Sequence, residues 1–265
     1  LRCGRRAHGP GVVRHGLQVK ATAGLEASVQ RRNRLVMRQI PERPLAQFDL
    51  STPEGRKRAR RDYMWNDHAF LRLRFQNAHW ISEELVRTNQ PSPEQLAGWK
   101  ARGIKTIINL RGGFDGSFYV LEKEACAQLG LKLVDFTITS REVPSRARVL
   151  GARDLFQSIE YPALMHCKSG ADRAGIMSVF YMHFRKGKPI AEALDQLHLR
   201  YLHMKAGKTG VLDYVFERYL AEGEPAGLPF VEWVESPAYQ PDAMKADFRA
   251  KWWGTLFTER LLKRE

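Results

Sequence analysis

The chain has 265 residues, of which 43% are hydrophobic and 10% aromatic, a size and composition typical of one globular domain with added segments. No window approaches the roughly 18 uninterrupted apolar residues of a membrane span, so we expect a soluble or peripheral protein. The three cysteines, Cys3, Cys126 and Cys167, show neither a CxxC motif nor a metal-like spacing to histidine. This pattern excludes a disulfide framework and a zinc site, predicts no metal or other cofactor, and favours a reducing compartment.

The net charge of +14 is unevenly distributed, and half of it lies in the first 36 residues. There, eight basic residues face a single acidic one, Glu26, and no apolar core of a secretory signal follows the charges. We predict that residues 1–36 are a disordered or non-native extension, because the first methionine is Met37. A targeting arm and a nucleic-acid arm are weaker alternatives. No nucleic-acid partner is expected, since the rest of the chain does not interleave aromatic and basic residues on a strand.

Residues 37–69 are polar and proline-rich, and we interpret them as a linker and basic arm in which the run "EGRKRARRDYMW" forms a short basic helix. Next comes "FLRLRFQNAHWISEELVRTNQ", in which apolar and polar residues alternate over Phe70 to Phe75. This stretch predicts one or two strands near the edge of a sheet. The interval 70–222 then forms the main domain.

Strands and helices are expected to alternate along this domain. Helices are predicted over residues 92–103, 118–129 and 149–159, and strands over 104–110, 131–138 and 162–167. Three further helices follow, over residues 171–187, 189–203 and 209–223. The fold class is therefore α/β, with a mostly parallel central sheet flanked by helices.

Residues 223–265 are predicted to be an amphipathic helical C-terminal extension. Met244, Phe248, Trp252 and Leu256 recur at four-residue spacing among basic residues. A stripe of this kind packs on its own domain, or lies on an anionic bilayer, or binds a partner. The sequence favours the first of these.

The segment "ALMHCKSGADRAGIMSVFYM" places Cys167 between a buried strand and an apolar helix. A strand-to-helix turn directs unpaired backbone N–H groups and the positive end of the helix dipole towards one point. With Lys168 and Arg173 nearby, this field favours a nucleophilic thiolate at Cys167. Arg173 can bind two oxygens of a phosphate, so the turn suits attack of sulfur on phosphorus, a cysteinyl-phosphate intermediate and its hydrolysis.

The residues "HCKSGADRAG" resemble the His-Cys-five-residues-Arg signature of the cysteine-dependent phosphatases, the protein tyrosine and dual-specificity superfamily, in its compact bacterial form. The resemblance extends upstream to "RTNQPSPEQLAGWKARGIKTIINLRGG" and implies a dual-specificity phosphatase-like fold and a hydrolase that dephosphorylates without a metal. It implies Cys167 as the nucleophile and a supporting role for His166 in orienting the loop. The residues that it implies for phosphate binding, here called the phosphate loop, are Lys168, Ser169, Gly170, Ala171, Asp172 and Arg173.

Two departures from this family pattern bear on mechanism. The family usually has Ser or Thr after the arginine, where this chain has Ala174, so hydrolysis of the intermediate is expected to be slow. The family's usual loop aspartate is also missing, and the loop "TITSREVPS" offers only Glu142 as a general acid. Asp172 is the preferred candidate, as in a bacterial subgroup with Asp-Arg at this point, and Asp135 is interpreted as structural.

The substrate is expected to be a phosphorylated protein or a phosphorylated lipid or inositol. Lys168 resembles the lysine of phosphoinositide-directed relatives, while the family as a whole favours protein. Further side chains that can rim the pocket are Arg111, Arg141, His203, Lys205 and Lys208. A catalytically weak phosphate-binding pseudo-phosphatase is the alternative function. The expected location is cytoplasmic, with peripheral contact to an anionic membrane as a variant of it.

Overall fold

The structure is a computed structural model that describes residues 48–262, with side chains described as far as residue 252. The extension predicted for residues 1–36 and the first part of the predicted arm lie outside these residues. In the part of the chain that is described, no helix combines the length and the apolar character needed to span a bilayer.

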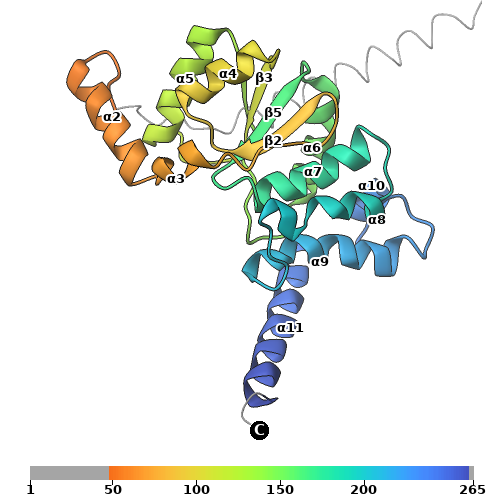
Figure 1. The fold of residues 1–265 in the computed structure, drawn as a ribbon. Helices are drawn as coiled ribbons and strands as arrows, with labels where there is room; N and C mark the ends of the chain where they lie inside the picture. Colours follow the sequence, from red (N-terminus) through yellow and green to blue (C-terminus); the bar gives the residue numbers. More distant parts are fainter. Residues whose placement is uncertain (1–47, 263–265) are drawn as a thin grey trace, which may run out of the picture. The chain divides into compact units, whose positions relative to one another are not determined.

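A five-stranded sheet forms the centre of the fold (Figure 1). Its order is β1 (His79–Trp80), β2 (Leu85–Asn89), β5 (Ala163–Cys167), β3 (Thr106–Asn109) and β4 (Lys132–Asp135). Only the short edge strand β1 is antiparallel to its neighbour, which confirms the mostly parallel sheet. Because parallel strands end at the same edge, β5 delivers Cys167 beside the last residues of β2 and β3.

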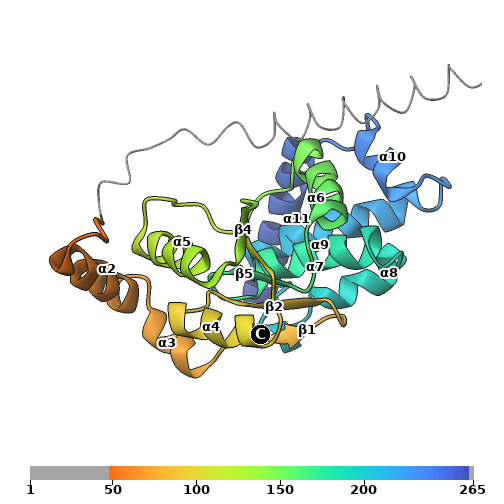
Figure 2. The same ribbon diagram turned by 90° about the horizontal axis from the view of Figure 1, so that it is seen from above.

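Helices cover both faces of the sheet (Figure 2). On one face, α4 (Pro93–Ala101) and α5 (Ser117–Leu129) pack on side chains such as Val86, Ile107 and Leu164. On the other, α6 (Arg146–Ser158) and α7 (Asp172–Phe184) pack on their strand neighbours, Leu85 and Ile108 among them. Successive residues of each strand point into opposite cores, so the central strands are buried on both faces.

The local signals that predicted α4 and α5 are confirmed. Ser92 accepts a hydrogen bond from the Gln95 N–H, and the Gln95 side chain accepts one from the Ser92 N–H, which forms a capping box. Helix α5 ends at Gly130, whose φ of 61° is the left-handed conformation common at helix ends.

The stretch predicted to form one or two strands near the sheet edge does contain β1 and β2, but its alternating part, residues 70–75, forms the helix α3 (Ala69–Arg74) instead. Within it Ala69 and Arg72, three residues apart, are buried, and Arg72 forms an ion pair with Asp67. The buried Arg72 side chain reaches back to Asp67, which precedes the helix, and this contact with the burial of Ala69 overrides the period-two pattern of the apolar residues.

The basic helix expected before α3 does form, as α2 (Pro53–Trp65). It packs on α5 through a small apolar cluster that includes Ala59, Tyr63 and Leu121. The domain boundary placed at residue 70 stays a prediction, although this cluster contains residues from both sides of it.

The helix predicted over residues 189–203 is also corrected, because the chain there forms α8 (Ile190–Ala193), η1 (Leu194–Gln196) and η2 (Leu199–Tyr201). The carbonyl of Gln196 accepts a hydrogen bond from Arg87 instead of continuing a helix. The chain continues through η3 (Lys208–Gly210), α9 (Val211–Arg218), the π-helical turn η4 (Tyr219–Gly223) and α10 (Phe230–Glu235).

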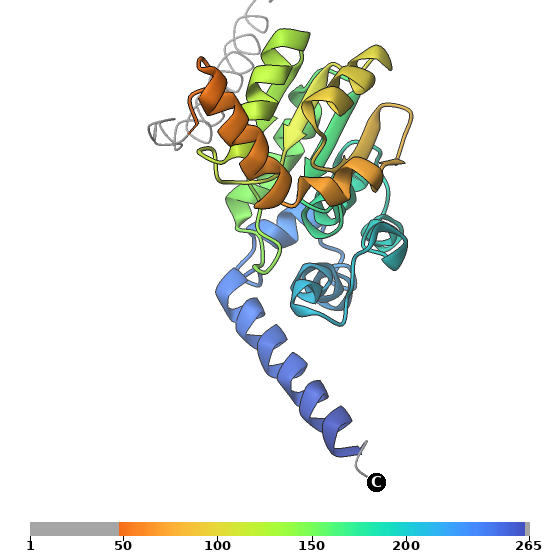
Figure 3. The ribbon, with the colours of Figure 1, turned by 60° about the vertical axis from the view of Figure 1, so that its left-hand side comes forward.

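The last element is the long helix α11 (Pro241–Leu262), which contacts α9 (Figure 3). Met244 is buried in the main core, Phe248 packs partly against it, and Trp252 donates a hydrogen bond to the Ala206 carbonyl. These residues of the predicted stripe therefore contact their own domain. Leu256 lies beyond the described side chains.

Candidate active site at the phosphate loop

Cys167 is the last residue of β5, and its side chain lies under the turn that leads into α7. The residue is only 2% exposed, and its Sγ accepts a hydrogen bond from the Gly170 N–H at 3.2 Å. A backbone N–H directed at sulfur stabilises the thiolate more than the thiol. The expected placement of Cys167 at the base of a turn of backbone amides is thus what the geometry provides.

Gly170 packs the loop tightly against β2. Its φ is +75°, and a Cβ at this position would come within 2.7 Å of the Asn89 nitrogen. Two independent reasons therefore require glycine at this position: the left-handed conformation and the close approach to the neighbouring strand.

Arg87, in the middle of β2, holds the loop from behind and is a residue that the sequence analysis missed. Its guanidinium is fully buried and donates to the carbonyls of Gly170 and Ala171 at 2.9 and 2.7 Å, and to that of Gln196 at 2.7 Å. By binding the carbonyl groups, Arg87 fixes the peptides so that their N–H groups can face the opposite side. It joins the phosphate loop to the helical segment after α8.

Arg87 also brings a positive charge close to the nucleophile. Burial lowers the pKa of Arg87 to about 10, while the negative forms of Cys167 and Tyr201 oppose this shift. The side chain is still charged at neutral pH, and its guanidinium lies 4.2 Å from the centre of the Tyr201 ring. A buried cation that interacts favourably with Cys167 adds to the field expected from Lys168 and Arg173.

Arg173 occupies the first turn of α7 and is partly buried. Within the described part of the chain its guanidinium forms no hydrogen bond or ion pair. Ala171, at the N-cap, offers no side chain that caps the first turn. The helix N-terminus and Arg173 therefore remain available to an anion.

Asp172 and His203 form an ion pair next to the loop. His203 is buried between two carboxylates: its Nδ1 lies 2.7 Å from Oδ1 of Asp172, and its Nε2 lies 2.7 Å from Oδ2 of Asp213. Burial by itself would lower the pKa of His203, but the hydrogen bonds to Asp172 and Asp213 raise it to about 9. The sequence predicted His203 as a rim residue, and the structure places it as a link between α7 and α9.

The other carboxylates considered as general acids are each paired elsewhere. Glu142 forms an ion pair with Lys245 of α11. Asp135 accepts hydrogen bonds from Asn109 and Tyr119, and burial raises its pKa.

His166 is fully buried, and its Nε2 lies 2.7 Å from the Glu122 carboxylate of α5. Neither ring nitrogen forms a hydrogen bond with a described residue. The imidazole therefore faces α5, while the His166 carbonyl accepts from the Leu110 N–H. Its supporting role in orienting the loop stays a prediction.

Lys168 lies at the edge of a cluster of charges around Asp67, a residue that the sequence analysis did not single out. The Asp67 carboxylate binds Arg111 at 2.6 Å and also Arg72, and the Lys168 Nζ lies 3.5 Å from it. Burial raises the pKa of Asp67, but these cations outweigh burial and lower it overall. The cluster ties α3 to the loop and keeps an excess of positive charge there.

Asn77 is a third residue that the sequence analysis missed, and it connects the loop to its rim. Its side-chain amide donates to the Ser169 carbonyl at 2.9 Å and to the Tyr201 carbonyl at 3.3 Å. Of the remaining rim candidates, Arg141 and Lys208 are exposed and Lys205 pairs with Glu217. Among residues 48–252, no group of three or more His, Cys, Asp or Glu side chains is placed to hold a metal ion.

A family model described as a DSP-PTPase phosphatase fused to NAD+ kinase matches residues 76–210, just over half of the chain. The chain belongs to this family. The phosphatase domain thus matched contains the sheet, the phosphate loop, Arg87 and His203, and it agrees with the resemblance carried by "HCKSGADRAG". The chain is therefore a phosphatase of the dual-specificity and tyrosine phosphatase superfamily.

Solved structures with this phosphatase architecture are also similar to the chain. Tk-PTP, in its active form, is 19% identical, with 54% of this chain and 97% of Tk-PTP covered and a TM-score of 0.43. TpbA of P. aeruginosa is 22% identical, covering 51% and 80%, with a TM-score of 0.42. PTPMT1 is 14% identical, covering 56% and 99%, with a TM-score of 0.42. Among curated proteins no match is found.

Proposed function

We propose that the phosphatase is a phosphomonoester hydrolase that acts through a cysteinyl-phosphate intermediate on Cys167. The observation that carries this proposal is the hydrogen bond from the Gly170 N–H to Sγ, at the carboxyl end of β5 and beneath the N-terminus of α7. The buried charge of Arg87, which interacts favourably with Cys167, supports the thiolate.

In the first step the Cys167 thiolate attacks phosphorus, and a sulfur–phosphorus bond forms while the bond from phosphorus to the leaving oxygen breaks. The electron pair of the broken bond goes to the leaving oxygen, which takes a proton from a general acid. Backbone N–H groups of the phosphate loop and the Arg173 guanidinium bind the non-bridging oxygens, whose charge is redistributed in the transition state.

We propose Asp172 as the general acid, with Glu142 as the second candidate. The proton that the leaving oxygen takes comes from the Asp172–His203 pair, in which Nδ1 of His203 lies 2.7 Å from Oδ1 of Asp172. Asp172→Asn should then slow alkyl phosphates far more than p-nitrophenyl phosphate, whose leaving group is stable as an anion. Equal losses for both substrates would assign Asp172 a positioning role only, and a selective loss in Glu142→Gln would assign the acid to Glu142.

In the second step water attacks phosphorus, the sulfur–phosphorus bond breaks, and its electron pair returns to sulfur. The proton of water passes to the carboxylate that acted as acid. No hydroxyl stands at position 174, where Ala174 is fully buried, to assist the departing sulfur. We therefore expect this step to limit turnover.

The substrate proposed is a phosphorylated protein or a phosphorylated lipid or inositol. The side chain of Lys168 is 44% exposed, and its Nζ lies 3.5 Å from Asp67. It can therefore also bind a second anionic group of the substrate. A panel of phosphopeptides, inositol phosphates and phospholipids, assayed by phosphate release, ranks these classes.

The basic test compares turnover of p-nitrophenyl phosphate by the full chain, by Cys167→Ser and by Cys126→Ser. Cys126 is the matched control, because it is equally buried and burial raises its pKa to about 12, which keeps it a thiol. The proposal requires complete loss in Cys167→Ser and full activity in Cys126→Ser. Release of at most one equivalent of product by the unmodified chain would instead support the phosphate-binding pseudo-phosphatase.

A further inference from the structure

The helices α2 and α3 expose an unusual run of large apolar side chains. Trp65 is 63% exposed, and further exposed side chains in this run are Phe70, Leu71, Leu73 and Phe75. Contiguous exposed apolar side chains mark sites of interaction on soluble domains. We call these five residues, together with the exposed cations Lys57, Arg60, Arg61 and Arg74, the α2–α3 surface.

The four cations of the α2–α3 surface form no ion pair within the described residues, whereas Arg56 of α2 pairs with Glu124. Along α2 and α3 the exposed acidic side chain is Glu54, in the first turn of α2; Asp67 is buried, and Asp62 is bonded to Asn66 and Ser117. The surface is therefore apolar and positively charged together.

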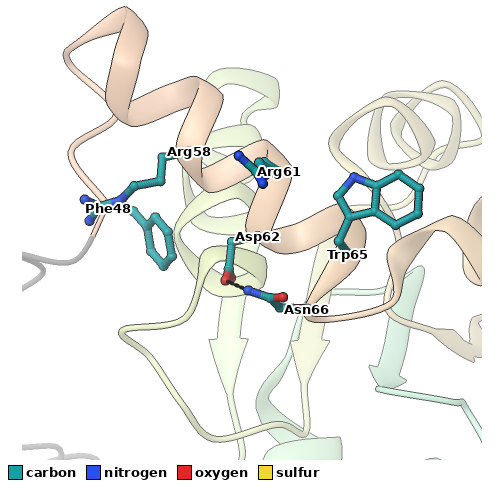
Figure 4. Close-up of a pocket in the computed structure, with 6 residues that line it drawn as sticks. All are labelled: Phe48, Arg58, Arg61, Asp62, Trp65 and Asn66. Carbon is teal, nitrogen blue, oxygen red and sulfur yellow. Dashed lines mark hydrogen bonds between the residues drawn. The ribbon is translucent and has the colours of Figure 1, made fainter.

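A hollow on α2 adds to this surface (Figure 4). It has a volume of about 790 Å³ and is lined by Phe48, Arg58, Arg61, Asp62, Trp65 and Asn66. Two guanidinium groups beside an aromatic ring suit an anionic headgroup at the boundary between water and hydrocarbon.

The α2–α3 surface is also joined to the active site. Asp67, between the two helices, binds Lys168 and Arg111, and Asn77, just after α3, bonds to the Ser169 and Tyr201 carbonyls. A second group of exposed apolar side chains flanks Tyr201: Leu199, Leu202 and Met204, the last 63% exposed. Apolar side chains therefore stand on both sides of the contacts that Asn77 makes.

We propose that the α2–α3 surface docks the phosphatase on an anionic lipid bilayer, with the phosphate loop next to the headgroups. The cations match the negative surface potential, and Trp65 with the leucines reaches the acyl boundary. Met244 and Phe248, which suggested a membrane contact through the C-terminal helix, pack on the protein core instead. The inference concerns binding and does not depend on the chemistry at Cys167.

The test is cosedimentation of the full chain with vesicles of phosphatidylcholine, with and without phosphatidylglycerol. The proposal predicts binding only to the anionic vesicles. Arg60→Glu/Arg61→Glu and Trp65→Ala/Leu71→Ala should each weaken this binding at least about tenfold. The matched control is Lys123→Glu/Lys132→Glu, which makes the same change in net charge at exposed positions of α5 and β4 and should leave binding within about twofold.

Turnover of p-nitrophenyl phosphate in solution verifies the folding of each variant, since none of the changed residues belongs to the phosphate loop. The proposal is overturned if the full chain fails to bind anionic vesicles, or if the control pair loses as much binding as Arg60→Glu/Arg61→Glu. It also falls if the Trp65→Ala/Leu71→Ala change only converts a dimer to a monomer, which would make the surface a contact between copies of the chain. Vesicle binding with no turnover of any phosphomonoester would retain this inference and reject the proposed function.

Discussion

Nδ1 of His203 lies 2.7 Å from Oδ1 of Asp172, so a buried imidazolium holds the residue that directly precedes Arg173, the arginine proposed to bind phosphate. On its other side the same ring binds Asp213 of α9. The helical region after α7 is thereby tied to the first turn of α7, and the position of Arg173 depends on residues some thirty to forty positions later in the chain.

His203→Gln should destabilise the fold by about 2–3 kcal/mol at neutral pH, because it leaves two carboxylates without their cation. Since the folded-state pKa is raised to about 9 from 6.5, the stability that His203 contributes is complete below about pH 6.5 and is lost as the pH rises through 9. Denaturant unfolding should show that the difference in unfolding free energy between the unmodified chain and His203→Gln shrinks as the pH rises through this range. The control is His198→Gln, which changes an exposed neighbouring histidine. A stability difference between the unmodified chain and His203→Gln that does not change with pH would refute the raised pKa of His203.

Arg87→Lys should cost about 2–4 kcal/mol of folding stability and at least tenfold in turnover. A lysine keeps the charge but cannot donate to the carbonyls of Gly170, Ala171 and Gln196 at once. Thermal unfolding and steady-state kinetics measure the two effects. Arg102→Lys, which changes an exposed arginine resting on Trp99, serves as the comparison and should alter neither.

Gly170→Ala should abolish phosphate binding and destabilise the domain well beyond the roughly 1 kcal/mol of a left-handed alanine. The reason is the approach of a Cβ to the backbone of β2 at 2.7 Å. Gly103→Ala isolates the conformational part, because Gly103 has a φ of +90° with nothing within 4 Å of its Cβ position. Equal destabilisation of the two variants would mean that the close approach carries no cost.

Ala174→Ser should accelerate hydrolysis of the intermediate, roughly tenfold, without changing its formation. The added hydroxyl would stabilise the departing sulfur of Cys167. Rapid-quench kinetics with p-nitrophenyl phosphate separates the two steps as a burst followed by a steady rate. The burst amplitude should fall and the steady rate should rise, whereas a slower burst would show that the serine disturbs the loop.

The sheet and the phosphate loop were predictable from sequence because their signals are local. Continuous apolar strands, the capping box at Ser92 and the Cys-to-Arg spacing each act within a few residues. The ion pair of Asp67 with Arg111 and the carbonyl contacts of Arg87 join segments that are far apart in the chain, and periodicity contains no information about them. An arginine within the strand "LVRTN" is the one signal that pointed to Arg87, since a charge in a buried strand requires a partner.

The most direct test of the cysteinyl-phosphate mechanism is mass spectrometry of the full chain after acid quench during turnover of p-nitrophenyl phosphate. The account predicts one phosphoryl group per chain, attached to the peptide that contains Cys167 and absent from Cys167→Ser. A phosphoryl group on another residue, or steady turnover by a chain that never gains one, would contradict it.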